Sequence, residues 1–291
     1  MTDMEKHKRT LQSLAGLSVG DAFGERFFHV SSDLTVFRQL PDGQWAWTDD
    51  THMALSIVDV LFSCGHIDED ALVRLFAKRY TGEPWRGYGG GARRLLALYA
   101  RGADWRVEAP RLFDGGSYGN GGAMRAAPIG AYFAGDPAQA AVEAQRSASV
   151  THAHLEGQAG AVAVAAATAI MSSSGSPAGT AFLHETASYV SPSATRDMIE
   201  EAAQIDAAEF HRAVSVLGTG QQVAAFDTVA FCLWVAAHHC RDFETALWTT
   251  VRGLGDRDTT CAIVGGMIAP VRTVPPVWLE HREPLPEGYS L

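Results

Sequence analysis

The sequence predicts an all-α protein, a compact multi-helix single domain, on three observations. Apolar residues recur at the i, i+3, i+4 and i+7 spacing of helices along most of the 291 residues. The alternation of polar and apolar residues that marks strands is scarce. Alanine is abundant, which favours close packing between helices. No linker or tandem repeat divides the chain, so residues 1–291 are expected to form one unit, with an irregular tail after about residue 270.

In the first half of the chain, local sequence features mark the ends of several expected helices. The first helix ends in the glycine-containing segment 16–24, and the second follows the acidic residues 48–50, which favour a helix start. Glycine-rich loops at 87–91 and 115–122 adjoin two later helices and let a ligand approach the backbone closely. The expected ranges are 4–19, 51–64, 68–80, 89–100, 122–134 and 136–149.

In the second half, serine-rich turns at 172–176 and 191–193 separate the expected helices. The longest apolar stretch, Ala159 to Met171, is too short to span a bilayer and suits a buried helix. His238 and His239 lie near a helix end, where they interact favourably with the helix dipole. The expected ranges are 154–172, 177–189, 194–204, 207–216, 222–239, 242–253 and 258–269.

The composition limits the classes of function. A hydrophobic content of 47% is enough for a sizeable core. The formal net charge of −10 argues against direct nucleic-acid binding, which usually needs a basic face, but leaves open a small anionic ligand held by a metal or helix N-termini. The polar N-terminus lacks the apolar core of a signal peptide. We expect reduced, mostly buried thiols in a cytoplasmic protein without a membrane span; the cysteines are Cys64, Cys232, Cys240 and Cys261.

Two acidic clusters far apart in the chain each open an expected helix. The first comprises Thr48, Asp49, Asp50 and Thr51, and the second comprises Asp256, Arg257, Asp258 and Thr259. Each cluster by itself is explained by ordinary helix capping, because acids and threonines stabilise a first helical turn. Two clusters with more acids than a cap needs also predict a shared metal site. Oxygen ligands without nearby Cys or His suit a hard cation such as Mg²⁺ or Mn²⁺.

The glycine-rich segment 115–125 is the second candidate site. Its backbone N–H groups are suited to wrapping an anion, and Tyr118 is suited to stacking on a base or ribose, although a structural turn explains the same glycines. The segment 151–156 opens a later helix with His152 and His154. Two residues apart, these histidines do not share a helical face, which argues against zinc. His152 lining a polar ligand and His152 as a capping residue both remain open.

Together these segments resemble the ADP-ribosylhydrolase (ADP-ribosylglycohydrolase) family. The matching motifs are GLSVGDAFG (16–24), WTDDTHMAL (47–55), GSYGNGGAMR (116–125), THAHLEGQAGA (151–161) and GDRDTTCAIVGGMIA (255–269). They occur in the family's order and span nearly the whole chain. The glycine-loop motif is most similar to that of the serine-ADP-ribose hydrolase branch, and the dinitrogenase-reductase-activating glycohydrolase belongs to the same family.

The resemblance implies an all-α fold with a centre of two divalent metal ions, Mg²⁺ or Mn²⁺. The implied metal ligands are Thr48, Asp49, Asp50, Asp256, Asp258 and Thr259. The loop that would hold the diphosphate and neighbouring ribose comprises Gly116, Ser117, Tyr118, Gly119, Asn120 and Gly121. His152 would line the ADP-ribose cleft, and Tyr118 would stack on the ligand.

The sequence departs from the family pattern at one position. Family members usually carry a glutamate where this chain has Phe28, and that glutamate serves at the metal and in catalysis. Glu25 lies three residues earlier, nearly a full helical turn, and would project in a similar direction on one helix face. Either Glu25 replaces the missing acid, or the protein binds ADP-ribose without efficient turnover.

Three functions follow from the resemblance. The first is a hydrolase that releases ADP-ribose from a protein side chain or a small molecule, with Asp49, Asp50 or Glu25 moving protons. The second is an ADP-ribose-binding protein with weak or no catalysis, which the residue at position 28 motivates. The third is a hydrolase of a small ADP-ribose metabolite such as O-acetyl-ADP-ribose. The sequence does not identify the acceptor.

Overall fold

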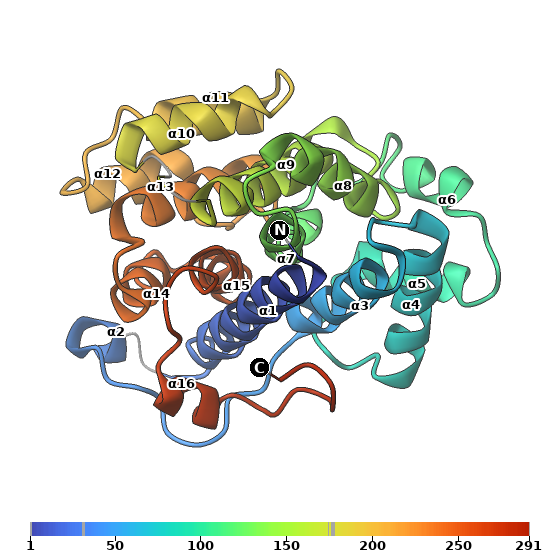
Figure 1. Ribbon diagram of the computed structural model, residues 1–291, viewed down its shortest axis with the longest axis horizontal. Helices are drawn as coiled ribbons and strands as arrows, with labels where there is room; N and C mark the ends of the chain where they lie inside the picture. Colours follow the sequence, from blue (N-terminus) through green and yellow to red (C-terminus); the bar gives the residue numbers. More distant parts are fainter. Residues whose placement is uncertain (1, 31–32, 174, 176–177, 291) are drawn as a thin grey trace.

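The computed structural model describes residues 2–30, 33–173, 175 and 178–290 (Figure 1). Its helices are α1 (Asp3–Arg26), α2 (Asp33–Phe37), α3 (Asp49–Cys64), α4 (Glu69–Gly82), α5 (Gly90–Tyr99), α6 (Trp105–Arg111), η1 (Asn120–Gly122), α7 (Ala127–Tyr132), α8 (Pro137–Ser149), α9 (Leu155–Met171), α10 (Gly179–Ser188), α11 (Ala194–Ala202), α12 (Phe210–Leu217), η2 (Ala225–Asp227), α13 (Val229–His239), α14 (Phe243–Val251), α15 (Arg257–Ile268) and α16 (Pro276–His281). The prediction of an all-α fold is confirmed, since the described residues form only two isolated β-bridges and no strand.

Helices α1 and α15 form the centre of the fold and lie antiparallel against each other. Their backbones nearly touch: a Cβ atom built on Gly20 would lie 2.0 Å from the carbonyl oxygen of Cys261, and one on Gly24 would lie 2.2 Å from that of Arg257. Only residues without a side chain allow such an approach. The contact brings the C-terminal end of α1 beside the N-terminal end of α15, which carries the second acidic cluster.

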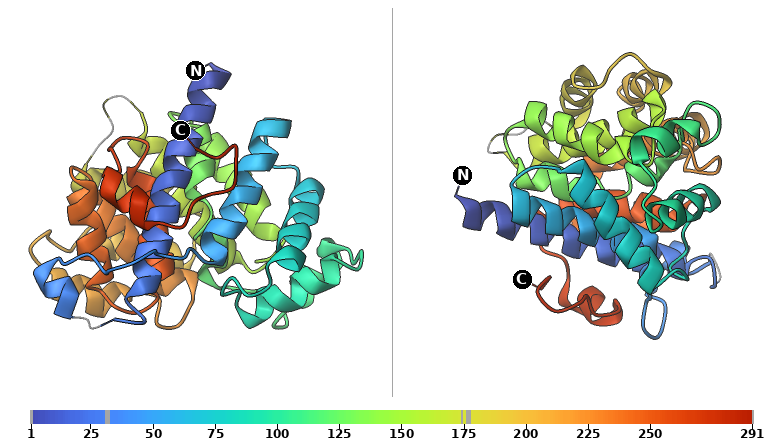
Figure 2. Two further views of the ribbon diagram at one scale, coloured as in Figure 1. Left: turned by 90° about the horizontal axis from the view of Figure 1, so that it is seen from below. Right: turned by 90° about the vertical axis from the view of Figure 1, so that its right-hand side faces the viewer.

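Helix α1 is longer than predicted. The sequence predicts its end near residue 19, and glycine at positions 20 and 24 lowers helix propensity by about 1 kcal/mol relative to alanine while suiting a close helix crossing. In the structure the helix continues to Arg26, and its residues from Leu14 to Gly24 are buried. Packing against α15 offsets the low propensity of Gly20 and Gly24. The N-terminal end of the helix projects from the rest of the molecule in both views of Figure 2.

Two expected helices begin later than predicted. The range 122–134 divides into the short turn η1 and helix α7, where Pro128 in the first turn favours a helix start. The range 222–239 divides into η2 and α13. Here the carboxylate of Asp227 accepts hydrogen bonds from the backbone N–H groups of Gln222 and Ala224, which holds the preceding residues in a turn instead of a helix.

Three short helices were not predicted: α2, α6 and α16. Helix α6 contains Pro110, which reads as a helix breaker in the sequence. The helix forms nevertheless, because it is only seven residues long and Asp104 caps it by accepting a hydrogen bond from the N–H of Arg106 at 3.0 Å. Helix α16 lies in the tail that was expected to be irregular.

The tail after α16 packs against the segment that leads into α3. The N–H of Glu283 donates to the carbonyl of Trp45 at 2.7 Å, and the N–H of Trp45 donates to the carbonyl of His281 at 2.7 Å. Arg86 binds both carboxylate oxygens of Glu283 at 2.7 and 2.9 Å and lies over the ring of Trp47 at 3.5 Å. These contacts fix the backbone immediately before the first acidic cluster.

The predicted pattern of thiols is found in part. Cys232 and Cys261 are buried, Cys240 is partly buried, and Cys64 is exposed; none of the four is paired in a disulfide. Across the described residues, no helix is both long and apolar enough to cross a membrane.

Candidate active site

A cavity of about 560 Å³ lies where the N-terminal ends of α3, α5 and α15 meet the glycine-rich loop. It contains most of the predicted site residues. Those that line it are Asp49, Asp50, Ser117, Tyr118, Gly119, Asn120, Gly121, His152, Asp256, Asp258 and Thr259. Thr48 and Gly116 are adjacent in the chain to lining residues but do not themselves line it, and Glu25 is outside it. Both acidic clusters and the glycine-rich loop therefore face one cavity.

The first acidic cluster sits at the N-terminal end of α3 and is anchored by a buried carboxylate on α1. Thr48 caps α3, and its N–H and hydroxyl both donate to Asp21 at 2.9 Å. The N–H and hydroxyl of Thr51 donate to the same carboxylate at 3.0 and 2.5 Å. Four donor groups, the N–H and hydroxyl of Thr48 and of Thr51, thus bind Asp21 and fix the helix start that carries Asp49 and Asp50. From the sequence, Asp21 is expected either to cap a helix or to reach into the site; in the structure it anchors the start of α3.

The second acidic cluster opens α15 and is held by the glycine-rich loop. The side-chain N–H of Asn120 donates to Asp256 at 2.7 Å and to the hydroxyl of Thr228 at 3.1 Å. The N–H of Asp256 donates to the carbonyl of Thr219 at 2.9 Å. Asn120 therefore connects the predicted ligand loop directly to the predicted metal cluster, and Thr259 is buried beside it.

Burial and mutual repulsion disfavour the charged forms of these carboxyls. Burial raises the pKa of Asp21 to about 6. Burial, and then the charge of Asp21, raise the pKa of Asp49 to about 7. The pKa values of Asp50 and Asp258 lie well above the usual range, because both are buried and each lies among other carboxylates. The repulsion acts between α3 and α15, so the two clusters that are distant in the sequence form one electrostatic unit.

The cavity has the oxygen donors that a hard cation requires. One carboxylate oxygen of Asp50 and one of Asp258, both Oδ1, are buried and have no hydrogen-bond partner. Such atoms are costly to bury unless a cation or a proton satisfies them. As the side chains stand, no group of three or more His, Cys, Asp or Glu residues within the described ranges is arranged to hold a metal ion. Donor chemistry and unsatisfied oxygens nevertheless fit Mg²⁺ or Mn²⁺.

The glycine-rich loop is folded tightly against the start of α9. Gly116 has φ +96°, and a Cβ atom there would lie 2.5 Å from the backbone nitrogen of His154, so no larger residue fits. Tyr118 is 49% exposed. Its ring stacks beside that of Phe226 at 6.3 Å and meets the edge of His154 at 5.8 Å. The loop thus presents an exposed aromatic ring at the cavity while its backbone is held in place.

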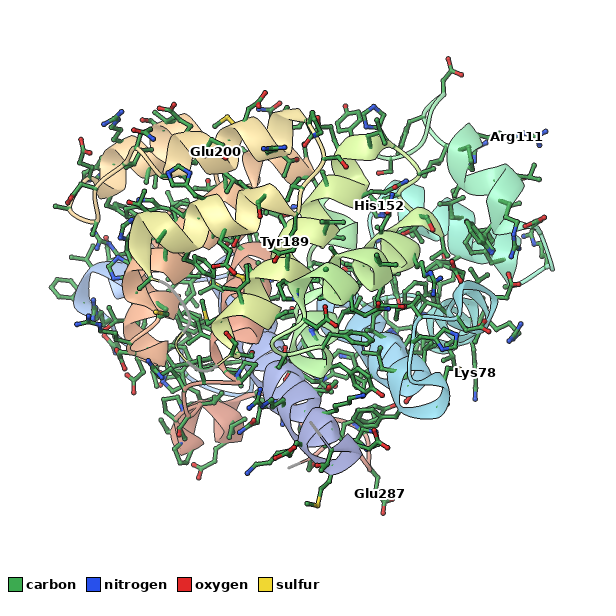
Figure 3. The ribbon with its side chains drawn as sticks, turned by 45° about the horizontal axis from the view of Figure 1, so that its top comes forward. Lys78, Arg111, His152, Tyr189, Glu200 and Glu287 are labelled. Atoms are coloured by element: carbon green, nitrogen blue, oxygen red, sulfur yellow. The ribbon has the colours of Figure 1, made fainter. Side chains whose placement is uncertain are left out.

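His152 lies at the turn between α8 and α9, where Figure 3 labels it, and packs against the glycine-rich loop. Its ring is close enough that a Cβ atom on Gly121 would lie 3.1 Å from Nε2. Burial, and then the nearby charge of Arg125, lower the pKa of His152 to about 3, so the imidazole is neutral near pH 7. His152 therefore acts as a hydrogen-bonding group and not as a cation.

The structure separates Glu25 from the candidate site. Glu25 accepts a hydrogen bond from Nε2 of His29 at 3.1 Å near the surface at the end of α1. Phe28 is 44% exposed, and its ring lies 4.8 Å from the guanidinium carbon of Arg257. Glu25 and Phe28 do not share a helix face, because α1 ends at Arg26 and Phe28 lies beyond it, and Glu25 does not line the cavity.

Several lining residues were not predicted from the sequence. Leu112 and the exposed ring of Phe113 form an apolar part of the wall, beside Gly89–Gly91 at the start of α5. Arg125 is fully buried yet lines the cavity. The motif GSYGNGGAMR contains Arg125, but its burial beneath the loop is a property of the three-dimensional packing.

The fold and cavity define an all-α protein with a carboxylate-lined ligand site beside a glycine-rich loop. The chain belongs to the ADP-ribosylglycohydrolase family, whose family model matches residues 2–288. The prediction made from the motifs is thereby confirmed.

Individual relatives agree with this assignment. The chain is 38% identical over 170 residues to ADP-ribosylhydrolase ARH3 of Homo sapiens, covering 51% of this chain and 46% of that protein. It is 30% identical over 165 residues to the ADP-ribosyl-[dinitrogen reductase] glycohydrolase of Rhodospirillum rubrum, covering 53% and 54%. The matches thus span about half the length of these curated relatives. A solved structure described as an ADP-ribosylglycohydrolase-related protein complex has a TM-score of 0.68 at 25% identity, covering 96% of this chain and 94% of that one.

Proposed function

We propose that this protein is a hydrolase that depends on two divalent metal ions, Mg²⁺ or Mn²⁺, and releases ADP-ribose from an acceptor by cleaving its glycosidic bond. The observation that carries the proposal is one cavity in which the unsatisfied oxygens of Asp50 and Asp258 face a glycine-rich loop with an exposed tyrosine. The acceptor is a protein side chain or a small molecule. Family membership and the names of the relatives support the choice of ADP-ribose.

In this proposal the two acidic clusters hold the metals and orient the terminal ribose. The residues that would hold the metals are Asp49, Asp50, Asp256, Asp258 and Thr259, which line the cavity, and Thr48, which directly precedes Asp49. Bound divalent ions supply Lewis-acid polarisation and a water of lowered pKa. Backbone N–H groups of the loop from Gly116 to Gly121 would bind the diphosphate, as anion nests do. Tyr118 would stack on the ligand, and His152 would donate a hydrogen bond to it.

The carboxylates have a second role at the reacting carbon. Cleavage of a glycosidic bond develops positive charge at the anomeric carbon, which neighbouring carboxylates stabilise. Asp49 or Asp50 would accept the proton of the attacking water. The oxygen or nitrogen of the departing acceptor would take its proton from a solvent water. The unpaired cysteines are consistent with a reducing compartment, and we place the activity in the cytoplasm.

The position of Glu25 favours a second candidate function, an ADP-ribose-binding protein with weak or no catalysis. The family glutamate is replaced by Phe28, and Glu25 lies outside the cavity, so neither position supplies an acid to the cavity wall. Binding requires only the loop, the aromatic ring and the metals. The two candidates differ in turnover and not in affinity for ADP-ribose.

Release of ADP-ribose from a panel of substrates tests the proposal. The purified protein is incubated with Ser-linked and Arg-linked ADP-ribosyl peptides and with O-acetyl-ADP-ribose, in Mg²⁺, in Mn²⁺ and in EDTA. We expect metal-dependent release from at least one substrate and none in EDTA, because the buried carboxylates repel one another and a bound cation would offset that repulsion and bind the unpaired oxygens of Asp50 and Asp258. Calorimetric binding of ADP-ribose without release from any substrate would instead support the binding function.

Glu25→Gln tests whether Glu25 takes part in catalysis. Because Glu25 contacts His29 outside the cavity, we expect kcat/KM for ADP-ribose release to change by no more than about twofold, the range of ordinary surface substitutions. The measurement is steady-state hydrolysis with Mg²⁺ on the best substrate of the panel. A loss of a hundredfold or more, with the melting temperature unchanged, would place Glu25 in the active conformation after all.

A further inference from the structure

Arg125 is a buried cation in the wall of the cavity that forms no salt bridge, although the charge of Asp49 across the cavity favours its charged form. It has no exposed surface, its guanidinium lies 4.7 Å from the centre of the Phe76 ring, and no carboxylate of the described residues lies within ion-pair distance. Its hydrogen bonds go to neutral acceptors: the carbonyl of Gly121 at 2.9 Å, the carbonyl of Ser147 at 2.9 Å and the hydroxyl of Thr151 at 2.8 Å. Burying a cation without a salt bridge costs free energy. The position of Arg125 therefore indicates a role at the adjoining cavity.

The contact with Thr151 has a defined direction. A guanidinium only donates, so the hydroxyl oxygen of Thr151 accepts from Arg125 and has one hydrogen left to donate. Two acceptors are within reach: Nδ1 of His152 at 2.8 Å and the carbonyl of Ala148 at 3.5 Å. The shorter contact has the normal length of a strong hydrogen bond and the longer one is at the limit. Donation to Nδ1 of His152 is therefore the more favourable arrangement, because the opposite direction would leave the hydroxyl hydrogen with only the 3.5 Å contact to Ala148.

This hydrogen bond determines which nitrogen of His152 carries the proton. Nδ1 accepts from Thr151, so the single proton of the neutral ring is on Nε2. Nε2 faces the glycine-rich loop, since a Cβ atom on Gly121 would lie 3.1 Å from it and one on Gly119 would lie 3.5 Å from it. Within the described part of the chain, no side chain accepts a hydrogen bond from Nε2. The N–H is available to a ligand in the cavity.

We propose that Arg125 is a positioning residue that acts through Thr151 to fix His152 as the Nε2–H tautomer, which presents a neutral hydrogen-bond donor to a ligand oxygen at the Gly119–Gly121 loop. The same guanidinium holds the carbonyl of Gly121, so one buried side chain fixes both the loop and the donor beside it. The ligand oxygen is that of a phosphate or a ribose hydroxyl. This inference rests on the proposed function for the identity of the ligand, but the tautomer is a property of the free protein.

Thr151→Val tests the relay, because valine keeps the shape of threonine and removes the hydroxyl. With ¹⁵N-labelled histidine, the two-bond and three-bond ¹⁵N–¹H correlations of the ring distinguish the Nδ1–H and Nε2–H tautomers. The His152 signals are assigned by their loss in His152→Gln. We expect Nε2–H in the unmodified protein and in Thr151→Ser, and a mixture or the Nδ1–H form in Thr151→Val.

Binding provides the second readout. By calorimetry in Mg²⁺, Thr151→Val is expected to raise the Kd for ADP-ribose about tenfold, the loss of one oriented hydrogen bond, whereas Thr151→Ser keeps it. Thr168→Val is the matched control: Thr168 is equally buried on α9, but its hydroxyl donates only to the carbonyl of Val164 at 2.7 Å within the helix. This control is expected to change neither the His152 spectrum nor the Kd.

Each outcome of these experiments leads to a different conclusion. An Nδ1–H tautomer in the unmodified protein overturns the inference, as does a folded Thr151→Val protein whose spectrum and Kd are unchanged. If Thr151→Val does not fold, the spectra of the unmodified protein and of Thr151→Ser still show which tautomer His152 adopts. A protein that shows the Nε2–H tautomer but binds no ADP-ribose keeps the relay and contradicts the proposed function instead.

Discussion

Asp258→Asn is expected to abolish metal-dependent release of ADP-ribose while leaving the fold intact. Asparagine keeps the shape of the side chain but removes a charge from a buried site in which carboxylates of α3 and α15 repel one another. Without metal, this substitution relieves repulsion, so the melting temperature should stay the same or rise. Lewis-acid assistance by a bound metal stabilises a transition state by several kcal/mol, so its loss should lower kcat/KM by about a thousandfold.

Two measurements on the same protein separate loss of metal from loss of structure. A thermal shift on adding Mg²⁺ is expected for the unmodified protein, because an ion that binds only the folded state stabilises it by mass action. Asp258→Asn should lose most of this shift. Glu25→Gln is the matched control, since it also neutralises an acid near these helix ends but lies outside the cavity. Full activity and an unchanged Mg²⁺ response in Asp258→Asn would show that the two clusters do not form one metal site.

The candidate site could be predicted where the sequence has more acids or glycines than a helix cap or a turn requires. The acids of residues 48–50 and 256–258 outnumber those of a helix cap, and the glycines of 115–122 outnumber those of a turn. Asp21 gave a weaker signal: a single acid between two glycines suggested a cap or a residue of the site, and only the hydrogen bonds from Thr48 and Thr51 show that it anchors α3.

Where the predicted helix bounds differ from the structure, tertiary contacts override the local conformational preference of the residues. Gly20 and Gly24 were interpreted as suited to a close helix crossing, which the structure confirms, but the first helix was expected to end near residue 19 and instead continues to Arg26 against α15. Pro110 concealed a short capped helix. Glu25 was assigned from the geometry of an ideal helix, but α1 ends one residue later and the side chain contacts His29. Each of these differences lies near the end of an element, where contacts with distant residues decide the conformation.

Gly20→Ala is expected to be among the most destabilising substitutions by a single methyl group in this protein. The new Cβ atom would lie 2.0 Å from the carbonyl oxygen of Cys261, 2.5 Å from its carbon and 3.0 Å from the nitrogen of Ala262. All three atoms belong to the backbone of α15, so no side chain can move aside and the helices must separate. Overpacking of this kind costs about 3 kcal/mol, which exceeds the gain of about 1 kcal/mol in helix propensity.

The separation should also reach the site, because α1 and α15 carry parts of it next to the point of contact. Asp21 follows Gly20 directly and fixes the start of α3, while Asp258 lies one turn from Cys261. We therefore expect Gly20→Ala to lower the melting temperature by roughly 5 °C and to weaken the Mg²⁺-induced shift as well. A stability loss that left the metal response intact would mean that the clusters are positioned independently of this helix pair.

Gly82→Ala is the matched control for the loss of stability. Gly82 ends α4, and a Cβ atom there would have nothing within 4 Å, so alanine should leave the melting temperature unchanged or raise it slightly. Differential scanning calorimetry of both variants, with and without Mg²⁺, compares the same chemical change in a crowded and an open place. Equal melting temperatures for the two variants would contradict the close contact of α1 with α15. A fall confined to Gly20→Ala would support that contact as the feature that holds the two acidic clusters at one cavity.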